Sequence, residues 1–170
     1  MANYAVVRTD KMQGTDVRDG LVSVRYQPSA TMTAIENGNV VLLDGLETGS
    51  REVFKGATPA ANSALAKVVL IATPELLYDE RKKALNEFRN EAGEIARGYH
   101  FHTNDIFSVT KTALDGAETP VVGDVVELKA GTKLNVVAAA TGATSGSTVI
   151  GKIIDINTVG AYTYYAIMVD

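Results

Sequence analysis

Side chains branched at Cβ are the feature that most constrains how this 170-residue chain can fold. Val, Ile and Thr together account for 46 residues. A branch at Cβ restricts χ1, which disfavours a helix and suits the pleated surface of a sheet. From residue 99 onward these residues recur in short runs separated by Gly-containing turns, roughly every ten residues, which is typical of a small barrel or sandwich. The sequence predicts a mainly β protein whose body is a small β-barrel or sandwich.

A second strand signal lies in the first half of the chain. Residues 67–73, KVVLIAT, form a continuous apolar run of strand length. Such a run, bounded by polar or small residues, indicates a strand.

One segment departs from the β pattern. Between residues 75 and 97, 11 of 23 residues are charged. Thr73-Pro74-Glu75 is a typical helix start, with a capping hydroxyl, a proline at the first position and an early carboxylate. Leu77, Leu85 and Phe88 recur at helical spacing. The sequence predicts one charged helix over about 75–92.

The pattern of the N-terminal segment indicates an extended arm. Tyr4–Val7 is a short apolar stretch, and the twelve residues that follow it are mostly polar. Ordering each residue of so long a tether costs about 1–2 kcal/mol, which strand pairing with a partner could offset. We therefore predict an arm over 1–30, with Tyr4, Val6, Val7 and Arg8 as its contact residues, and a β-rich body over 31–170 that includes the helix.

Composition excludes several classes of function. The chain has no Cys, so cysteine-based zinc sites, iron–sulfur clusters and thiol nucleophiles are ruled out. The net charge is −4 and there is no run of basic residues, so no nucleic-acid partner is expected. The longest uncharged run, residues 134–151, is rich in Gly, Ser and Thr, so no membrane span is expected.

The two histidines of the chain are candidate metal ligands. His100 and His102 alternate along an expected strand, and Asp105 follows. Two imidazoles and a carboxylate could hold iron or zinc. No third His exists, and Asp105 is placed to cap a turn, so we expect no metal site and keep the metalloenzyme as an alternative.

Four carboxylates cluster in sequence, at Asp115, Glu118, Asp124 and Glu127. Each adjoins a Gly turn or alternates outward along a strand, so all four are expected on the solvated surface. No Gly-x-Ser-x-Gly motif is present. We expect no catalytic residue, no cofactor and no enzymatic activity.

A tyrosine group near the C-terminus offers an alternative binding surface. Tyr162, Tyr164 and Tyr165 could stack on a sugar or base, together with the Gly/Ser/Thr loop at 141–148. This would suit a receptor- or glycan-binding module.

Three stretches resemble a known class of proteins. They are GNVVLLDGLETGSREVFKGATP at 38–59, KVVLIATPELLYDE at 67–80 and FRNEAGEIARGYHFHTNDIFSVT at 88–110. Together they are similar to small head-associated structural proteins of tailed bacteriophages, the decoration or cement class, over about residues 30–130.

The resemblance implies a function, a partner and a location. It implies a non-enzymatic virion protein that is made in the host cytoplasm, binds the outer face of the capsid and reinforces it. The expected partner is the major capsid protein, contacted through the N-terminal arm, and a homo-oligomer is expected, with a trimer as its form. A receptor- or glycan-binding module of a head or tail fibre is the alternative.

Overall fold

The chain is described by a computed structural model over residues 3–14, 20–77 and 84–170. In these ranges it is mainly β, as predicted, and its only helical elements are three 3₁₀ turns. The strands are β1 (Val7–Lys11), β2 (Leu21–Tyr26), β3 (Val40–Leu46), β4 (Val53–Ala57), β5 (Val68–Ile71), β6 (Ala96–His100), β7 (Ile106–Thr110), β8 (Leu114–Gly116), β9 (Val125–Glu127), β10 (Leu134–Val137), β11 (Val149–Val159) and β12 (Tyr162–Val169). The turns are η1 (Leu65–Lys67), η2 (Leu85–Glu87) and η3 (Lys111–Ala113).

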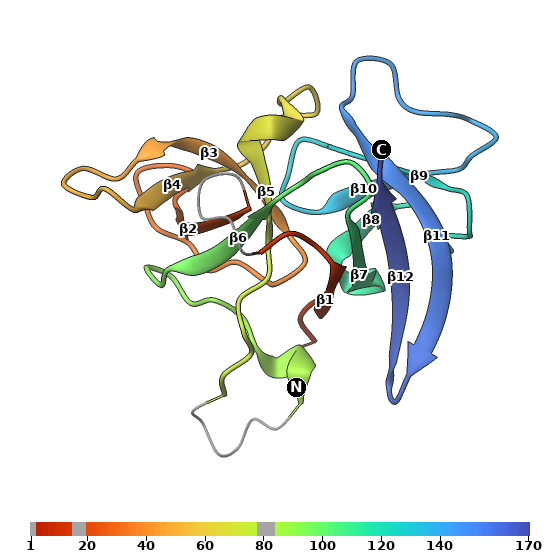
Figure 1. Cartoon of the computed structure of the whole chain (residues 1–170), viewed down its shortest axis with the longest axis horizontal. Helices are drawn as coiled ribbons and strands as arrows, with labels where there is room; N and C mark the ends of the chain where they lie inside the picture. Colours follow the sequence, from red (N-terminus) through yellow and green to blue (C-terminus); the bar gives the residue numbers. More distant parts are fainter. Residues whose placement is uncertain (1–2, 15–19, 78–83) are drawn as a thin grey trace.

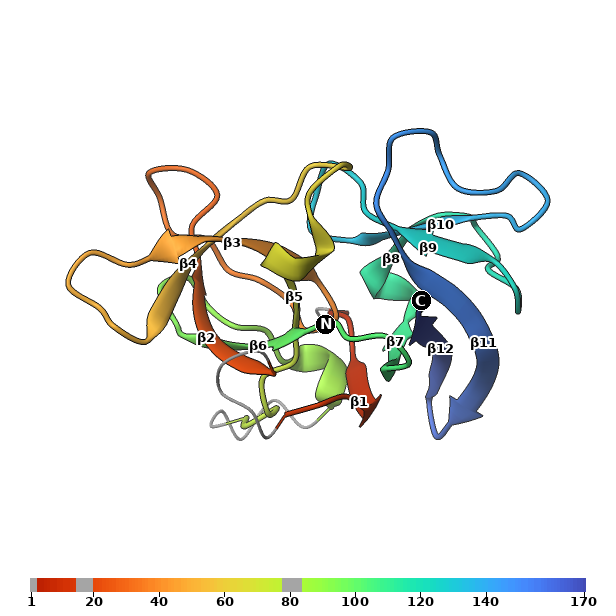
Figure 2. The same ribbon diagram turned by 45° about the horizontal axis from the view of Figure 1, so that its top comes forward.

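The strands form two sheets that lie side by side (Figures 1 and 2). One has seven strands in the order β1-β7-β12-β11-β9-β10-β8. The other closes into a five-stranded barrel, β2-β4-β3-β5-β6, because β6 also pairs with β2. The closed barrel is therefore built from the first half of the chain, whereas strand spacing had placed a barrel or sandwich in the second half.

Strand β5 is the wall that the two halves share. Val68 and Leu70 pack into the core between barrel and sheet, and Val69 and Ile71 fill the barrel interior. All four side chains are fully buried. Because successive side chains of a strand point to opposite faces, a strand buried on both faces must be apolar throughout. This confirms the strand predicted from the run at 67–73.

The N-terminal segment is not an arm in this structure. Strand β1 pairs with β7 in the seven-stranded sheet, and β2 belongs to the barrel. Ahead of β1, Val6 donates its backbone N–H to Thr110 Oγ1 at 3.0 Å and accepts the Thr110 N–H at 3.0 Å. Ala5, Val6 and Val7 are 1%, 2% and 9% exposed. Burial in the chain's own core supplies the free energy that the arm prediction assigned to a partner.

The predicted helix over 75–92 is wrong where the chain is described. Residues 84–92 contain only the single turn η2, which the Glu87 N–H closes by donating to the Ala84 carbonyl at 3.0 Å, and the Ala84 N–H donates to Glu87 Oε2 at 3.0 Å. Asn90 instead forms a β-bridge with Ile35. Leu85, one of the apolar residues at helical spacing, is 42% exposed, so that spacing does not mark the buried face of a helix here. Residues 78–83 lie outside the described parts of the chain.

Candidate functional site

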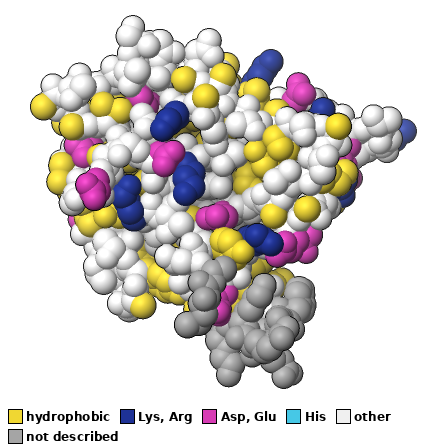
Figure 3. All heavy atoms as spheres, turned by 180° about the vertical axis from the view of Figure 1, so that it is seen from behind, with side chains coloured by type: hydrophobic (Ala, Val, Ile, Leu, Met, Phe, Trp, Pro, Cys, Tyr) yellow, Lys and Arg dark blue, Asp and Glu magenta, His cyan; other side chains and the backbone are white. Residues whose placement is uncertain are grey.

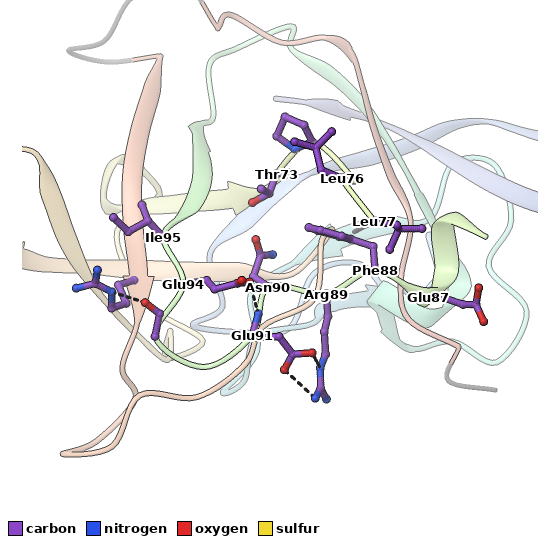
Figure 4. A pocket seen from close by; sticks show the side chains of 13 residues that line it. Thr73, Leu76, Leu77, Glu87, Phe88, Arg89, Asn90, Glu91, Glu94 and Ile95 are labelled. Atoms are coloured by element: carbon purple, nitrogen blue, oxygen red, sulfur yellow. Dashed lines mark hydrogen bonds and ion pairs between the residues drawn. The ribbon is translucent and has the colours of Figure 1, made fainter. Parts of the chain in front are cut away.

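An open groove of about 560 Å³ is the candidate binding site of the described chain. We call it the Phe88 groove (Figure 4). Its walls come from three separate parts of the sequence, namely strand β2, residues 73–77 and residues 87–95. The lining residues are Arg25, Thr73, Pro74, Leu76, Leu77, Glu87, Phe88, Arg89, Asn90, Glu91, Gly93, Glu94 and Ile95.

Large apolar side chains are exposed in this groove. Leu76 is 62% exposed and Ile95 is 48% exposed, and Leu77 and Phe88 also line it. In Figure 4, Leu76, Leu77 and Phe88 are seen on one side of the view, and Ile95 on the other. Apolar side chains that converge in a concave surface are typical of binding sites, whereas single exposed ones carry no such meaning.

Two arginines border the apolar residues, and each is held by an acidic partner. Arg25 donates to the Gly93 carbonyl at 2.8 Å and is ion-paired with Glu47. Arg89 forms two parallel hydrogen bonds to Glu91, at 3.0 and 2.9 Å. The hydrogen bond to Glu91 raises the pKa of the Arg89 guanidinium, so it stays charged at any physiological pH.

The wall formed by residues 87–95 is fixed to the rest of the fold by Asn90, which is 2% exposed. Its backbone exchanges two hydrogen bonds of 2.9 Å with Ile35, and its side-chain amide donates to the Ile35 carbonyl at 3.1 Å. Asn37 holds the opposite wall, donating to the Thr73 carbonyl at 2.7 Å and accepting the Thr73 N–H at 3.0 Å. Anchored walls reduce the entropy lost when a partner binds.

Sequence reasoning missed this groove. Leu77 and Phe88 are predicted on the buried face of a helix, which the described residues 75–77 and 84–92 do not form. A better signal was the presence of Phe88 and Arg89 beside apolar residues, since aromatic residues and Arg are enriched in interfaces.

The two predicted contact groups meet in the structure. Strand β7 has β1 on one side and β12 on the other, so the Arg8 and Tyr164 side chains project from the same face of the sheet. The Arg8 guanidinium lies 5.2 Å from the centre of the Tyr164 ring and pairs with Asp10 at 2.9 Å. Ser108 also hydrogen bonds to Asp10.

Burial decides which of these residues can meet a ligand. Val6 and Val7 are buried in their own chain, and Tyr164 is 5% exposed. Burial raises the pKa of the Tyr164 hydroxyl, an effect that the nearby Arg8 partly offsets. Tyr165 packs against the main core. Tyr162 is only partly buried, and it is the member of the tyrosine group that lines a cavity.

The loop at 141–148 does not join the tyrosine group. It precedes β11, whereas Tyr162 follows the turn at the far end of that strand (Figure 1). Eleven residues of strand span about 36 Å at 3.3 Å per residue. The alternative surface predicted from sequence is therefore not one surface.

His102 and Asp105 contact each other in the turn between β6 and β7. The Asp105 carboxylate accepts the His102 backbone N–H at 3.0 Å and lies 3.5 Å from His102 Nδ1. Asp105 caps the turn between β6 and β7, as predicted. Among the residues with described positions, no group of three or more His, Cys, Asp or Glu is placed to hold a metal ion.

Two of the four clustered carboxylates are buried, which contradicts the predicted solvated surface. Asp124 is 3% exposed and accepts the backbone N–H groups of Val121, at 2.9 Å, and Ala139, at 3.1 Å. Glu127 is 1% exposed and accepts from Asn135 at 2.9 Å and from the Thr144 N–H at 2.8 Å. Both carboxylates fasten loops, and buried charge is tolerated when hydrogen bonds satisfy it.

Asp115 and Glu118, the other two, are exposed as predicted. The face opposite to that of Figure 1 carries charges of both signs mixed with scattered apolar side chains (Figure 3). No single-sign field covers that face.

Comparison with protein-family models, with curated proteins and with solved structures finds no match for this chain. No helix in the described ranges has the length and apolar character needed to cross a membrane.

Proposed function

We propose that this chain is a non-enzymatic virion protein that binds the outer surface of a phage capsid and reinforces it. Its partner is the major capsid protein, and the Phe88 groove is the surface that meets it. The resemblance of residues 38–59, 67–80 and 88–110 to decoration and cement proteins supports this role, and two of these stretches contribute walls of the groove.

The observation that carries the proposal is the composition of the Phe88 groove. Aromatic residues and Arg are enriched in protein interfaces, and apolar residues dominate their centres. The groove combines Phe88 and Ile95 with Arg25 and Arg89. Its cavity of about 560 Å³ is large enough to take side chains from a partner surface.

The polar groups most suggestive of chemistry have structural uses, which supports a binding role. Asp124 and Glu127 fasten loops, and Asp105 caps a turn. Each is therefore explained by the fold without a substrate.

Co-sedimentation tests the proposal. Shells are assembled from the proposed partner, the major capsid protein of the same phage, without the chain itself, and are mixed with the purified full-length protein. We expect saturable binding. Leu76→Asp places a charge in the groove and should weaken binding at least ten-fold, because burying an unpaired carboxylate is costly.

Leu46→Asp is the matched control, since Leu46 is 49% exposed and does not line the groove. It should bind like the unchanged protein. Absence of any shell binding would refute the capsid role. An equal loss of shell binding in both variants would refute the groove as the interface, although the protein would still bind the capsid.

Reinforcement follows from mass action if the protein binds only intact shells. A ligand at 100 times its Kd stabilises the state it binds by about 2.7 kcal/mol per site. Saturated shells should therefore break at higher temperature or denaturant than bare ones. The protein would be made in the host cytoplasm and reach the capsid surface there, and light scattering of the purified chain tests the expected trimer.

A further inference from the structure

A second, smaller groove lies where the N-terminal segment meets η2 and the β11–β12 hairpin. Its volume is about 180 Å³. Residues 3–4, Asn86 of η2, residues 110–112 and the hairpin turn at 161–163 form its walls. We call it the Tyr162 groove. It shares no lining residue with the Phe88 groove, so a ligand there would not compete for the same side chains.

The chemistry of this lining is neutral and hydrogen-bonding. Apart from two tyrosines it consists of asparagines, threonines, one alanine and Lys111, with no carboxylate and no large aliphatic side chain. Lys111 is directed back into its own turn, where it donates to the Leu114 carbonyl at 3.4 Å. Amides and hydroxyls both donate and accept, so they match a ligand that carries many hydroxyls.

The polar groups are held in place before any ligand arrives. Tyr162 donates its hydroxyl proton to Asn86 Oδ1 at 3.2 Å, and Asn86 Nδ2 donates to Asn3 Oδ1 at 2.9 Å. The Asn86 carbonyl accepts the Tyr4 N–H at 2.8 Å. These bonds join the N-terminal segment, η2 and the β11–β12 hairpin, and the Tyr162 oxygen retains lone-pair capacity to accept from a ligand.

The aromatic rings supply the apolar component. Arg89 lies 5.2 Å from the centre of the Tyr4 ring and covers one of its faces, so the groove meets the remaining face or edge. Tyr162 packs edge-on against Tyr164, with 6.3 Å between ring centres. Tyrosine pairs an apolar ring with a polar tip, which suits a ligand having a C–H face and a hydroxyl rim.

We infer that the Tyr162 groove binds one ring of a neutral saccharide. The volume is below the range of about 300–1,000 Å³ usual for drug-sized ligands and equals about six water volumes, which fits one sugar unit rather than an oligosaccharide. An aliphatic side chain of a peptide would be matched by large aliphatic walls and a basic one by carboxylates, and this lining has neither.

The test is amide NMR of the full-length protein titrated with three probes, namely methyl α-glucoside, methyl β-galactoside and N-acetylglucosamine. At least one should shift the amides of Tyr4, Asn86 and Thr163, with a Kd of about 1–10 mM, as expected for so small a ligand. No shift with any probe at 50 mM, or shifts elsewhere only, would overturn the inference.

Paired tyrosine variants show whether the groove itself responds. Tyr162→Phe keeps the ring and removes the hydroxyl, and it should weaken binding about five-fold, the value of one net hydrogen bond. Tyr26→Phe is the control, because the Tyr26 hydroxyl bonds Thr58 at 2.8 Å on the barrel. Equal affinity in both variants would refute the site, as would tighter binding of N-acetylphenylalanine amide than of every sugar.

Discussion

Replacing Val6 by Ala measures directly whether the N-terminal segment belongs to the core. Val6 is 2% exposed. The change removes the equivalent of two methylene groups, worth about 0.8 kcal/mol each, and the cavity left behind adds to this. We expect the free energy of unfolding to fall by about 2 kcal/mol. If residues 3–7 were an arm in solution, the loss would be near zero.

Val159→Ala is the matched control. Val159 lies in β11 and is 54% exposed, so the same side-chain truncation occurs there with little loss of burial. Its effect should stay within about 0.5 kcal/mol. In urea, with a slope of about 2 kcal/mol/M, the midpoint for Val6→Ala should fall by about 1 M. A drop no larger than that of the control would show that the segment leaves the core, and the arm interpretation would be right.

Three further perturbations test the structure elsewhere. Glu127→Gln replaces one of the two carboxylate oxygens, which accept from Asn135 and Thr144, with an NH₂ group that cannot accept. It should lower the free energy of unfolding by about 1–3 kcal/mol, as measured by thermal unfolding. Gly116→Ala should destabilise more than Gly123→Ala in the same assay, because both have positive φ but only at Gly116 would the new Cβ lie 2.3 Å from a backbone oxygen. The pKa of the Tyr164 hydroxyl should lie above the ordinary value for tyrosine, and higher still in Arg8→Met, as followed by tyrosinate absorbance. The pKa of the Tyr164 hydroxyl is higher in the folded chain than in the unfolded chain. The contribution of this group to stability is therefore complete below the unfolded pKa near 10 and is lost as the pH rises through the folded pKa. A Tyr164 pKa at or below the ordinary value would show that the ring is solvated.

The strands were predictable where local pattern and burial agree. The apolar run of β5 and the β-branched runs of β7, β11 and β12 each indicated a strand, and each is one. Their pairing was not predictable, because β1 joins β7 across about a hundred residues of sequence. Nothing local in Tyr4–Val7 says which strand it will meet.

The helix failed because its signals were local and the deciding contacts were not. Asn90 pairs with Ile35, which is 55 residues away. A charged segment with apolar residues at helical spacing is equally compatible with an irregular wall that exposes Leu76 and Ile95. Propensity is a weak prior that tertiary hydrogen bonds override.

The candidate sites were predictable only in part. Tyr162 was predicted as part of an alternative ligand surface and Tyr4 as part of the arm, and the structure places both in the lining of one groove. Asp124 and Glu127 were misplaced because alternation along a strand assumes one solvated face. Their neighbours Val126 and Leu128 are fully buried, so this region is enclosed by loops on the other side.

Because β5 contributes side chains to both cores, unfolding of the barrel and unfolding of the seven-stranded sheet should be coupled. Opening either half would expose Val68 and Leu70 or Val69 and Ile71 to water. Partial unfolding that spares one half is therefore penalised, and the two sheets should behave as one cooperative unit, or foldon. The amides of β5 should then be among the last to exchange with deuterium, at a rate set by global unfolding.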